Sequence, residues 1–198
     1  MNSDDWKARQ ASSFGAIASI YRRGRPSYPT EALDWLVPEG SPRVLDLGAG
    51  TGKLTEQLVA RGLDVVAVEP SDGMREEFAK ALPGVPILAG AGESIPLDDA
   101  SVDAVLVAQA WHWVDPERAV PEVARVLRPG GRLGLIWNVR DEREAWLADL
   151  GRIIHVEGDQ DMHTNDAVAG PPFGPFEHTV IEWTHHLSPD RLIDMVTS

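Results

Sequence analysis

The sequence predicts one doubly wound α/β domain, with a mainly parallel sheet that is covered by helices on both faces. Near-continuous apolar runs, which suit strands buried on both faces, alternate with segments whose apolar residues recur at helical spacing. Three glycines at alternate positions follow the first strand-like run, where ligands meet the carboxyl ends of parallel strands. With 198 residues, of which 43% are hydrophobic, the chain is long enough for a single domain with a sizeable core.

The predicted elements alternate along most of the chain. The predicted strands are short runs rich in valine, leucine and isoleucine, at residues 43–48, 63–70, 85–90, 101–110 and 132–139. The predicted helices carry apolar residues three and four positions apart, and they fall at residues 29–37, 51–62, 71–82, 118–127, 145–158 and 188–198.

Two segments depart from this simple alternation. Asp115 and Pro116 resemble a helix cap and first turn, but Pro121 would interrupt a helix that began there. We therefore expect a short turn first and the true helix from near Pro121. Residues 159–174, rich in glycine and proline, predict a loop, and the alternating residues 176–187 predict a further strand.

The composition excludes several classes of function. The chain has no cysteine, so it has neither a disulfide framework nor a thiolate metal site. Its net charge of -13 repels phosphate backbones and anionic membranes, so we expect no nucleic-acid partner and no membrane partner. The histidines show no metal-binding spacing, so we expect no metal, and no apolar run predicts a transmembrane span or leader, so we expect a cytoplasmic protein. Nothing in the sequence indicates an oligomeric state.

The glycines after the first strand raise the question of which ligand they admit. A dinucleotide fingerprint has the spacing G-x-G-x-x-G, whereas Gly48, Gly50 and Gly52 follow the spacing G-x-G-x-G. Lys53 stands where the third dinucleotide glycine would be. This spacing favours S-adenosylmethionine over a nicotinamide dinucleotide, although an ordinary tight turn is a further alternative.

Two acidic residues bear on the choice of ligand: one suits both ligands, and the other suits the amino-acid tail of S-adenosylmethionine. Glu69 ends the second strand, where a carboxylate can accept hydrogen bonds from ribose hydroxyls, and both ligands carry a ribose. A zwitterionic amino-acid tail also needs an acceptor for its ammonium group, and Asp46 and the loop carbonyls could supply one.

Four blocks of sequence carry a family resemblance. "VLDLGAGTGKLT", "VVAVEPSDGMRE", "GESIPLDDASVDAVLVAQAWHWVD" and "EVARVLRPGGRLGLIWN" resemble the successive motifs of class I S-adenosylmethionine-dependent methyltransferases, over roughly residues 14–138. "YRRGRPSYP" and "AWHWVD" are most similar to the small-molecule branch that includes trans-aconitate methyltransferases. The resemblance implies the Rossmann-like methyltransferase fold and S-adenosyl-L-methionine as cofactor.

The resemblance also implies which residues contact the cofactor. In order from the methionine tail through the ribose and adenine to the sulfonium, they are Asp46, Gly48, Ala49, Gly50, Gly52, Glu69, Pro70, Ser71, Met74, Ala91, Gly92, Glu93, Ala108 and Gln109. Ala91 departs from the family, since many relatives carry an aspartate there for the adenine amino group. Glu93, a backbone carbonyl or water would have to serve instead.

A catalytic group is harder to identify. His112 is the candidate general base, but a histidine that only shapes the pocket fits the pattern as well. Trp111 and Trp113 flank it, and they either pack in the core or rim or present an aromatic face to the sulfonium or the acceptor. A carboxylate acceptor would need no base.

The segment 21–29 is either a solvated connector or a lid over the cofactor, with Tyr21, Arg25 and Tyr28 directed inward. Arg140 is a second candidate for an anionic acceptor, or an exposed arginine. Together with Arg22, Arg23 and Arg25 it would flank the cleft, and arginine suits a carboxylate.

We expect a single methyltransferase domain over residues 1–198, with a lid at 1–30, a cofactor-binding core at 31–139 and an acceptor-side region at 140–198. Family members continue into a last antiparallel strand, so we expect a truncated form that lacks it. The predicted function is methyl transfer to oxygen of a small polar or acidic metabolite, and an apolar, quinone-like acceptor is the competing possibility. A nicotinamide-dependent oxidoreductase and a cofactor-binding domain without activity are the alternative classes.

Overall fold

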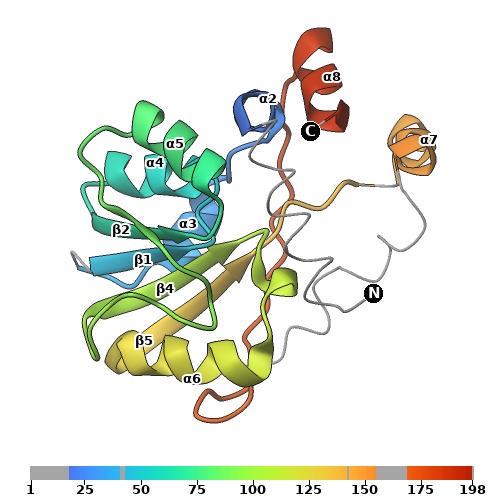
Figure 1. Ribbon diagram of the computed structural model, residues 1–198. Coiled ribbons are helices and arrows are strands. Elements are labelled where there is room, and N and C mark those ends of the chain that lie inside the picture. The colour runs from blue at the N-terminus through green and yellow to red at the C-terminus, as the bar shows by residue number, and fades with distance from the viewer. Residues whose placement is uncertain (1–17, 41–42, 142, 155–168, 198) are drawn as a thin grey trace, which may run out of the picture.

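The computed structural model describes residues 18–40, 43–141, 143–154 and 169–197 (Figure 1). Five strands form one sheet in the order β3-β2-β1-β4-β5, and every neighbouring pair is parallel. The strands are β1 (Arg43–Leu47), β2 (Asp64–Glu69), β3 (Ile87–Ala89), β4 (Val102–Ala108) and β5 (Leu127–Ile136). The strand order reverses between β1 and β4, which is where an open parallel sheet offers a ligand crevice at its carboxyl edge. The predicted doubly wound α/β fold is confirmed.

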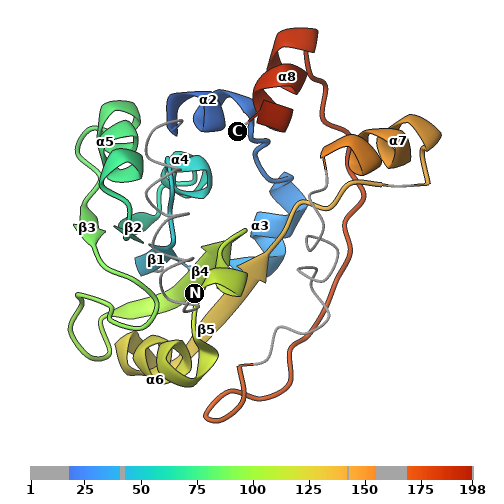
Figure 2. The same cartoon turned by 45° about the vertical axis from the view of Figure 1, so that its right-hand side comes forward.

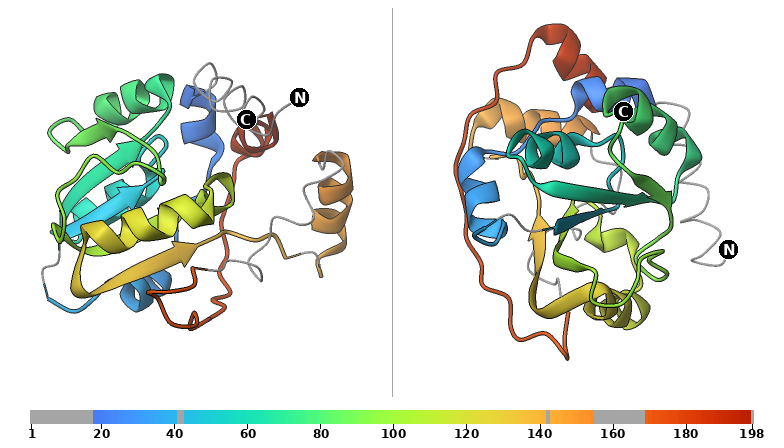
Figure 3. Two further views of the ribbon diagram at one scale, coloured as in Figure 1. Left: turned by 60° about the horizontal axis from the view of Figure 1, so that its bottom comes forward. Right: turned by 90° about the vertical axis from the view of Figure 1, so that its left-hand side faces the viewer.

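Helices cover both faces because the strands are apolar at consecutive positions (Figure 3). Along β1, Val44 packs in a cluster with α3 (Thr30–Leu36) and α4 (Lys53–Ala60), whereas Leu45 packs on the other side with α6 (Pro116–Val126). Successive side chains of a strand point to opposite faces, so each face of the sheet acquires its own core. Phe78 of α5 (Asp72–Ala81) forms a third, smaller cluster against Ala67 of β2.

The expectation for Pro121 is wrong, because α6 is one helix that begins at Pro116 and ends at Val126. Asp115 caps it by accepting a hydrogen bond from the Glu117 backbone N–H at 3.1 Å. Pro121 lies on the exposed side of the helix, where water can satisfy the carbonyl that a proline leaves without a partner. Val123 and its neighbours bury the opposite side, which stabilises the helix despite the proline.

The region after β5 has less regular structure than predicted. Helices α7 (Ala145–Ile154) and α8 (Pro189–Thr197) form, but residues 176–187 adopt no strand. This segment runs on the β5 side of the sheet (Figure 2), and the described residues contain no backbone hydrogen bond between it and β5. Its alternation does not produce a buried face, since Val180 is 89% exposed and only Phe176 and Ile181 of this segment pack, partly buried, against the core clusters. The predicted strand is therefore wrong.

The two ends of the described chain meet above the carboxyl edge of the sheet. Helix α2 (Ala18–Gly24) packs against α8 (Figures 1 and 2), and a Cβ atom on Gly24 would lie 2.5 Å from the backbone nitrogen of Met195. Arg23 Nε also donates to Asp194 Oδ2 at 2.9 Å. Among the helices within these described ranges, none has the length and apolar character needed to cross a membrane.

Candidate functional site

A cavity of about 2800 Å³ lies at the carboxyl ends of β1, β4 and β5 and extends to the segment 173–185. The predicted site residues that line it are Tyr21, Arg25, Tyr28, Asp46, Gly48, Ala49, Gly50, Ala108, Gln109, His112, Trp113 and Arg140. The other predicted site residues lie outside this lining, namely Gly52, Glu69, Pro70, Ser71, Met74, Ala91, Gly92, Glu93 and Trp111. The structure thus brings the expected methionine, sulfonium and acceptor ends of the site into one space.

The glycine loop needs its glycines for two reasons. Gly50 has a φ of +55° and open space around the position of a Cβ atom, so its backbone is accessible from the cavity that it lines. Gly48 has a φ of +73°, and a Cβ atom there would lie 2.7 Å from that of Ala110. A side chain at either position would strain the turn or fill the space in which a ligand meets the main chain.

Asp46 is fully buried beneath this loop. Its Oδ2 atom accepts a hydrogen bond from Thr55 Oγ1 at 2.5 Å, and its Oδ1 atom has no partner among the described residues. Burial raises the pKa of Asp46 to about 7, although hydrogen bonds from Thr55 lower it, and the nearby Glu69 raises it further. A buried oxygen without a partner is costly, and an ammonium group would satisfy it.

Glu69, at the tip of β2, is tied to the loop by backbone hydrogen bonds. Its Oε2 atom accepts from Gly50 N and its Oε1 atom accepts from Ser71 N, both at 2.9 Å. Burial raises the pKa of Glu69, while these two bonds lower it. Each carboxylate oxygen keeps a second lone pair, so the side chain can still accept from two hydroxyls of a ribose.

The segment expected to read the adenine edge is a tight turn. Ala91 and Ser94 form a bridge, with Ser94 N donating to the Ala91 carbonyl at 3.0 Å. Glu93 Oε1 accepts from Asp115 N at 2.7 Å, so this carboxylate holds the start of α6. A Cβ atom at Gly92 would lie 2.8 Å from Val114 Cγ1, which explains the glycine there by packing.

The end of β4 is linked to the end of β5. Gln109 has a φ of +56°, which is unusual for a residue with a side chain, and its backbone N–H donates to the Ile136 carbonyl at 2.9 Å. Its Nε2 atom donates to the Asn138 carbonyl at 3.3 Å, and Asn138 Nδ2 donates to the Ser27 carbonyl at 3.1 Å. Residues ahead of the first strand are thereby tied to the end of the last strand across the cavity.

The "AWHWVD" segment separates its two tryptophans. Trp111 is buried in the main core cluster, which favours the packing interpretation. His112 and Trp113 line the cavity, and their ring centroids lie 4.7 Å apart. His112 is therefore placed where it could meet an acceptor.

The segment that precedes α3 also lines this cavity. The Arg25 guanidinium lies 4.7 Å from the centroid of the Tyr21 ring. Tyr28 is buried, and burial together with the nearby Tyr21 and Asp46 raises the pKa of its hydroxyl, so it stays protonated. Gln57 holds the backbone of Tyr28 by two hydrogen bonds, of 2.9 and 2.7 Å.

Arg22 and Arg23, which were expected at the acceptor, are directed to other helices. Arg22 donates to the Thr51 carbonyl and, at 3.1 Å, to Glu56 Oε2, whereas Arg23 pairs with Asp194. The neighbouring residues of a helix point in different directions, so α2 directs these side chains to α4 and α8. The expectation that Arg22 and Arg23 flank the acceptor is thus wrong, but Arg25 and Arg140 line the cavity.

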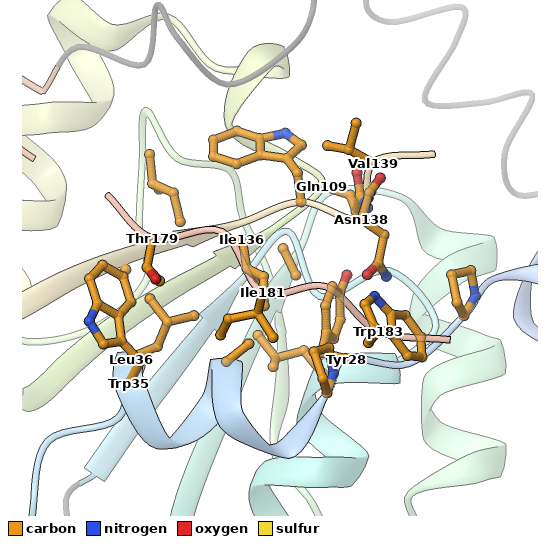
Figure 4. Close-up of a pocket in the computed structure, with 18 of the residues that line it drawn as sticks. Tyr28, Trp35, Leu36, Gln109, Ile136, Asn138, Val139, Thr179, Ile181 and Trp183 are labelled. Carbon is orange, nitrogen blue, oxygen red and sulfur yellow. Dashed lines mark hydrogen bonds between the residues drawn. The ribbon is translucent and has the colours of Figure 1, made fainter. Parts of the chain in front are cut away.

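The acceptor end of the cavity is rich in apolar side chains (Figure 4). Ile136, Ile181 and Trp183 lie there together with Asn138. Five of the seven tryptophans line the cavity, namely Trp35, Trp113, Trp137, Trp146 and Trp183. No cluster of histidine, aspartate and glutamate suited to a metal ion occurs in the part of the chain that the structure describes.

Thr55, Gln57 and Asn138 were not predicted from the sequence. Thr55 lies three residues after Gly52 in "GTGKLT", between Leu54 and Leu58, and a polar residue among the apolar positions of a predicted helix was a signal for it. The partners of Gln57 and Asn138 lie 29 and 111 residues away along the chain, and no local pattern indicates them.

The family model described as "Methyltransferase domain" matches residues 45–135. An uncharacterized methyltransferase of Mycobacterium tuberculosis is 61% identical over 187 residues, which are 94% of this chain and 76% of that protein. An uncharacterized methyltransferase-like protein of Schizosaccharomyces pombe is 40% identical over 147 residues, 72% of this chain and 57% of that protein. A structure from Anaeromyxobacter dehalogenans, provisionally assigned as a type II methyltransferase, is similar with a TM-score of 0.55 and 31% identity, over 66% of this chain and 58% of that one.

The chain is a class I S-adenosylmethionine-dependent methyltransferase. Membership of this family implies S-adenosylmethionine as the cofactor. The site fits this molecule, since the buried Asp46 Oδ1 offers an acceptor to its ammonium group and Gly50 exposes its main chain. The nicotinamide alternative is set aside because the family and the glycine spacing agree. Closeness to trans-aconitate methyltransferases stays a prediction.

Proposed function

We propose that this methyltransferase transfers its methyl group to an oxygen of a small, acidic or polar metabolite. The observation that carries the proposal is that Arg25 and Arg140 line the same cavity as Gly50 and Gln109. An arginine fork binds a carboxylate by two parallel hydrogen bonds, so two arginines could orient an acidic acceptor toward the sulfonium.

The cofactor, when bound, supplies a methyl group on a sulfonium, which is already an activated leaving group. The residues of the chain then have to hold the acceptor in line with that methyl group and exclude water. A carboxylate oxygen attacks without a base, which is consistent with the absence of an obvious one. For a hydroxyl acceptor, His112 is the residue of the cavity wall that could take the proton.

A second candidate acceptor is an apolar, quinone-like ring. It is favoured by the five tryptophans of the cavity and by Ile136 and Ile181. Aromatic faces would stack on such a ring, and burial of its surface would supply most of the affinity.

A small acceptor is more consistent with the chain than a nucleic acid or a membrane surface. The net charge of -13 opposes binding to any polyanion, and the cavity of about 2800 Å³ has room for a metabolite. A cytoplasmic location also stays part of the proposal.

The proposal is tested in two steps. First, methyl incorporation from labelled cofactor into a fractionated metabolite extract identifies the acceptor. Second, Arg25→Ala and Arg140→Ala are compared with Arg152→Ala, which changes an exposed arginine on α7 that pairs with Asp149. For an acidic acceptor, the first two variants raise the KM for the acceptor roughly tenfold or more, as expected for loss of a charged hydrogen bond, and leave cofactor affinity unchanged. Full activity in both variants would favour the apolar acceptor, and Trp183→Ala would then be the variant that fails.

A further inference from the structure

Asp46 and Thr55 form a buried pair beneath the glycine loop. Both side chains are fully buried, and Thr55 Oγ1 donates to Asp46 Oδ2 at 2.5 Å. The other oxygen, Oδ1, is buried and has no partner among the residues that the structure describes. Within the described residues, the hydrogen bonding to this carboxylate therefore comes from one residue of α4.

We propose that Thr55 is a positioning residue for the cofactor: it holds the Oδ2 side of Asp46, so that Oδ1 remains the acceptor for the ammonium group of the methionine tail. This role rests on the proposed contact between Asp46 and the cofactor. Asp46 lines the cavity and comes directly before the glycine loop, so its rotamer decides whether an acceptor is presented there.

The position of Thr55 explains why a hydroxyl is needed. It lies in the first turn of α4, on the buried face that also carries Leu54 and Leu58. A β-branched residue in a helix interior is slightly unfavourable, and a buried hydroxyl without a partner would add a further cost. The bond to Asp46 removes that cost, and a valine of the same shape would not replace it.

Several charged or titratable groups lie on the neighbouring strand or line the same cavity as Asp46. Glu69 is on the neighbouring strand, and the groups that line the same cavity from α2, the lead-in to α3, α4 and the turn after β4 are Tyr21, Arg25, Tyr28, Lys53 and His112. Burial and Glu69 raise the pKa of Asp46, and Thr55 opposes them. When an ammonium group binds, the protonated fraction of Asp46 releases its proton to solvent and the carboxylate accepts the N–H bond.

Two consequences distinguish positioning from packing. Affinity for a ligand with an ammonium group must rise with pH while Asp46 ionises, and the loss of the Thr55 hydroxyl must shift that rise to higher pH. A ligand without the amino-acid tail must be indifferent to both changes. A residue that only packed would affect both ligands at every pH.

The experiment is calorimetric titration of the whole chain with S-adenosylhomocysteine between pH 6 and pH 8.5, with methylthioadenosine as the ligand that lacks the tail. Thr55→Val, which keeps the shape and removes the hydroxyl, should weaken S-adenosylhomocysteine binding about tenfold at pH 7, the size expected for one charged hydrogen bond. Thr55→Ser, which keeps the hydroxyl, should bind within about twofold of the parent, and no variant should change the affinity for methylthioadenosine. Titration in buffers of different ionisation enthalpy should detect proton release on binding in the parent.

Equal affinities of Thr55→Val and the parent for S-adenosylhomocysteine at pH 7 would overturn the role of Thr55. So would an equal loss for both ligands, or a rise of S-adenosylhomocysteine affinity with pH that is not shifted to higher pH in Thr55→Val. If Thr55→Val does not fold by circular dichroism, Asp46→Asn takes its place: the pH dependence of binding must then vanish, and its persistence would overturn the inference. If the parent itself binds neither ligand, the cofactor site fails rather than the role of Thr55.

Discussion

The parallel sheet and the segment of residues 176–187 beside it differ in how far their apolar side chains are buried. In residues 43–136 the strands are buried on both faces, and Val44, Leu45, Val105 and Leu106 have no exposed surface. In residues 176–187 the chain is extended as well, but no strand forms and Val180 is 89% exposed. The first region is held by its core, whereas the second adds only the partly buried Phe176 and Ile181 to the core clusters and pairs Glu182 with Arg143 at 2.6 Å. The glycine loop belongs to the first region, and much of the cavity wall where the acceptor is expected belongs to the second.

This difference predicts a contrast in how the two regions tolerate loss of an apolar side chain. Phe78→Ala removes a fully buried ring between α5 and β2, and it should lower the free energy of unfolding by about 3–5 kcal/mol. Val180→Ala should change it by less than about 0.5 kcal/mol. Urea denaturation of both variants measures the contrast. A cost for Val180→Ala close to that for Phe78→Ala would mean that the crossing segment carries a core of its own.

A second prediction concerns Glu69, which lies beside the glycine loop. Glu69→Ala removes the acceptor for Gly50 N and Ser71 N and the expected partner of the ribose, so it should weaken binding of S-adenosylhomocysteine by about 1.5–3 kcal/mol. Glu76→Ala, which changes an exposed glutamate on α5, is the matched control and should bind as the parent does. Titration calorimetry gives both dissociation constants. An unchanged constant for Glu69→Ala would separate this residue from the ribose.

Sequence patterns predicted the sheet because strands that are buried on both faces appear in the sequence as continuous apolar runs. Each strand is a run of apolar residues between stops, and β1 to β5 lie within the predicted runs apart from an earlier start of β5 at Leu127. The same kind of pattern failed at residues 176–187, since alternation describes a strand only where a neighbouring strand and a core receive it. The prediction that the helix begins near Pro121 failed for a related reason. Pro121 lies on the exposed side of α6, where a proline is tolerated, and the neighbouring sequence does not show which side of the helix is exposed.

The residues of the candidate site also fall into those that the sequence predicts and those that it does not. The positions of the glycine loop, Asp46 and Glu69 near the carboxyl ends of β1 and β2 could be inferred from spacing, because the fold fixes where strand ends meet. Arg22 and Arg23 could not be assigned, since the directions of helix side chains depend on which helices pack beside them. The link from Asn138 to Ser27 joins segments 111 residues apart, and only the folded chain brings them together.

A third prediction uses the buried carboxylate of the sheet. Folding raises the pKa of Asp46 from an ordinary value of 3.8 to about 7, so between these values the folded protein binds the proton more tightly than the unfolded chain does. Asp46 therefore lowers the free energy of unfolding as the pH rises through this window. Asp46→Asn should be more stable than the parent at pH 8, on the order of 2 kcal/mol, and the advantage should vanish near pH 4. Denaturation at both pH values measures this.

Asp98→Asn is the control for that series, because Asp98 is exposed and the same substitution there removes a charge at the surface. An advantage of Asp46→Asn that is the same at pH 4 and pH 8 would point to packing rather than to the proton. An advantage shared by Asp98→Asn would point to the net charge of -13.

The smallest expected effect concerns how the C-terminal helix is held. Arg23 and Asp194 pair at 2.9 Å between α2 and α8, but their side chains are 57% and 23% exposed. Exposed pairs contribute little, so a double-mutant cycle of Arg23→Ala and Asp194→Ala should give a coupling energy below about 1 kcal/mol. The close approach of Gly24 to the α8 backbone indicates instead that shape positions this helix. A coupling energy well above that limit would show that charge, rather than packing, joins the two helices, and it should then fall as salt is added.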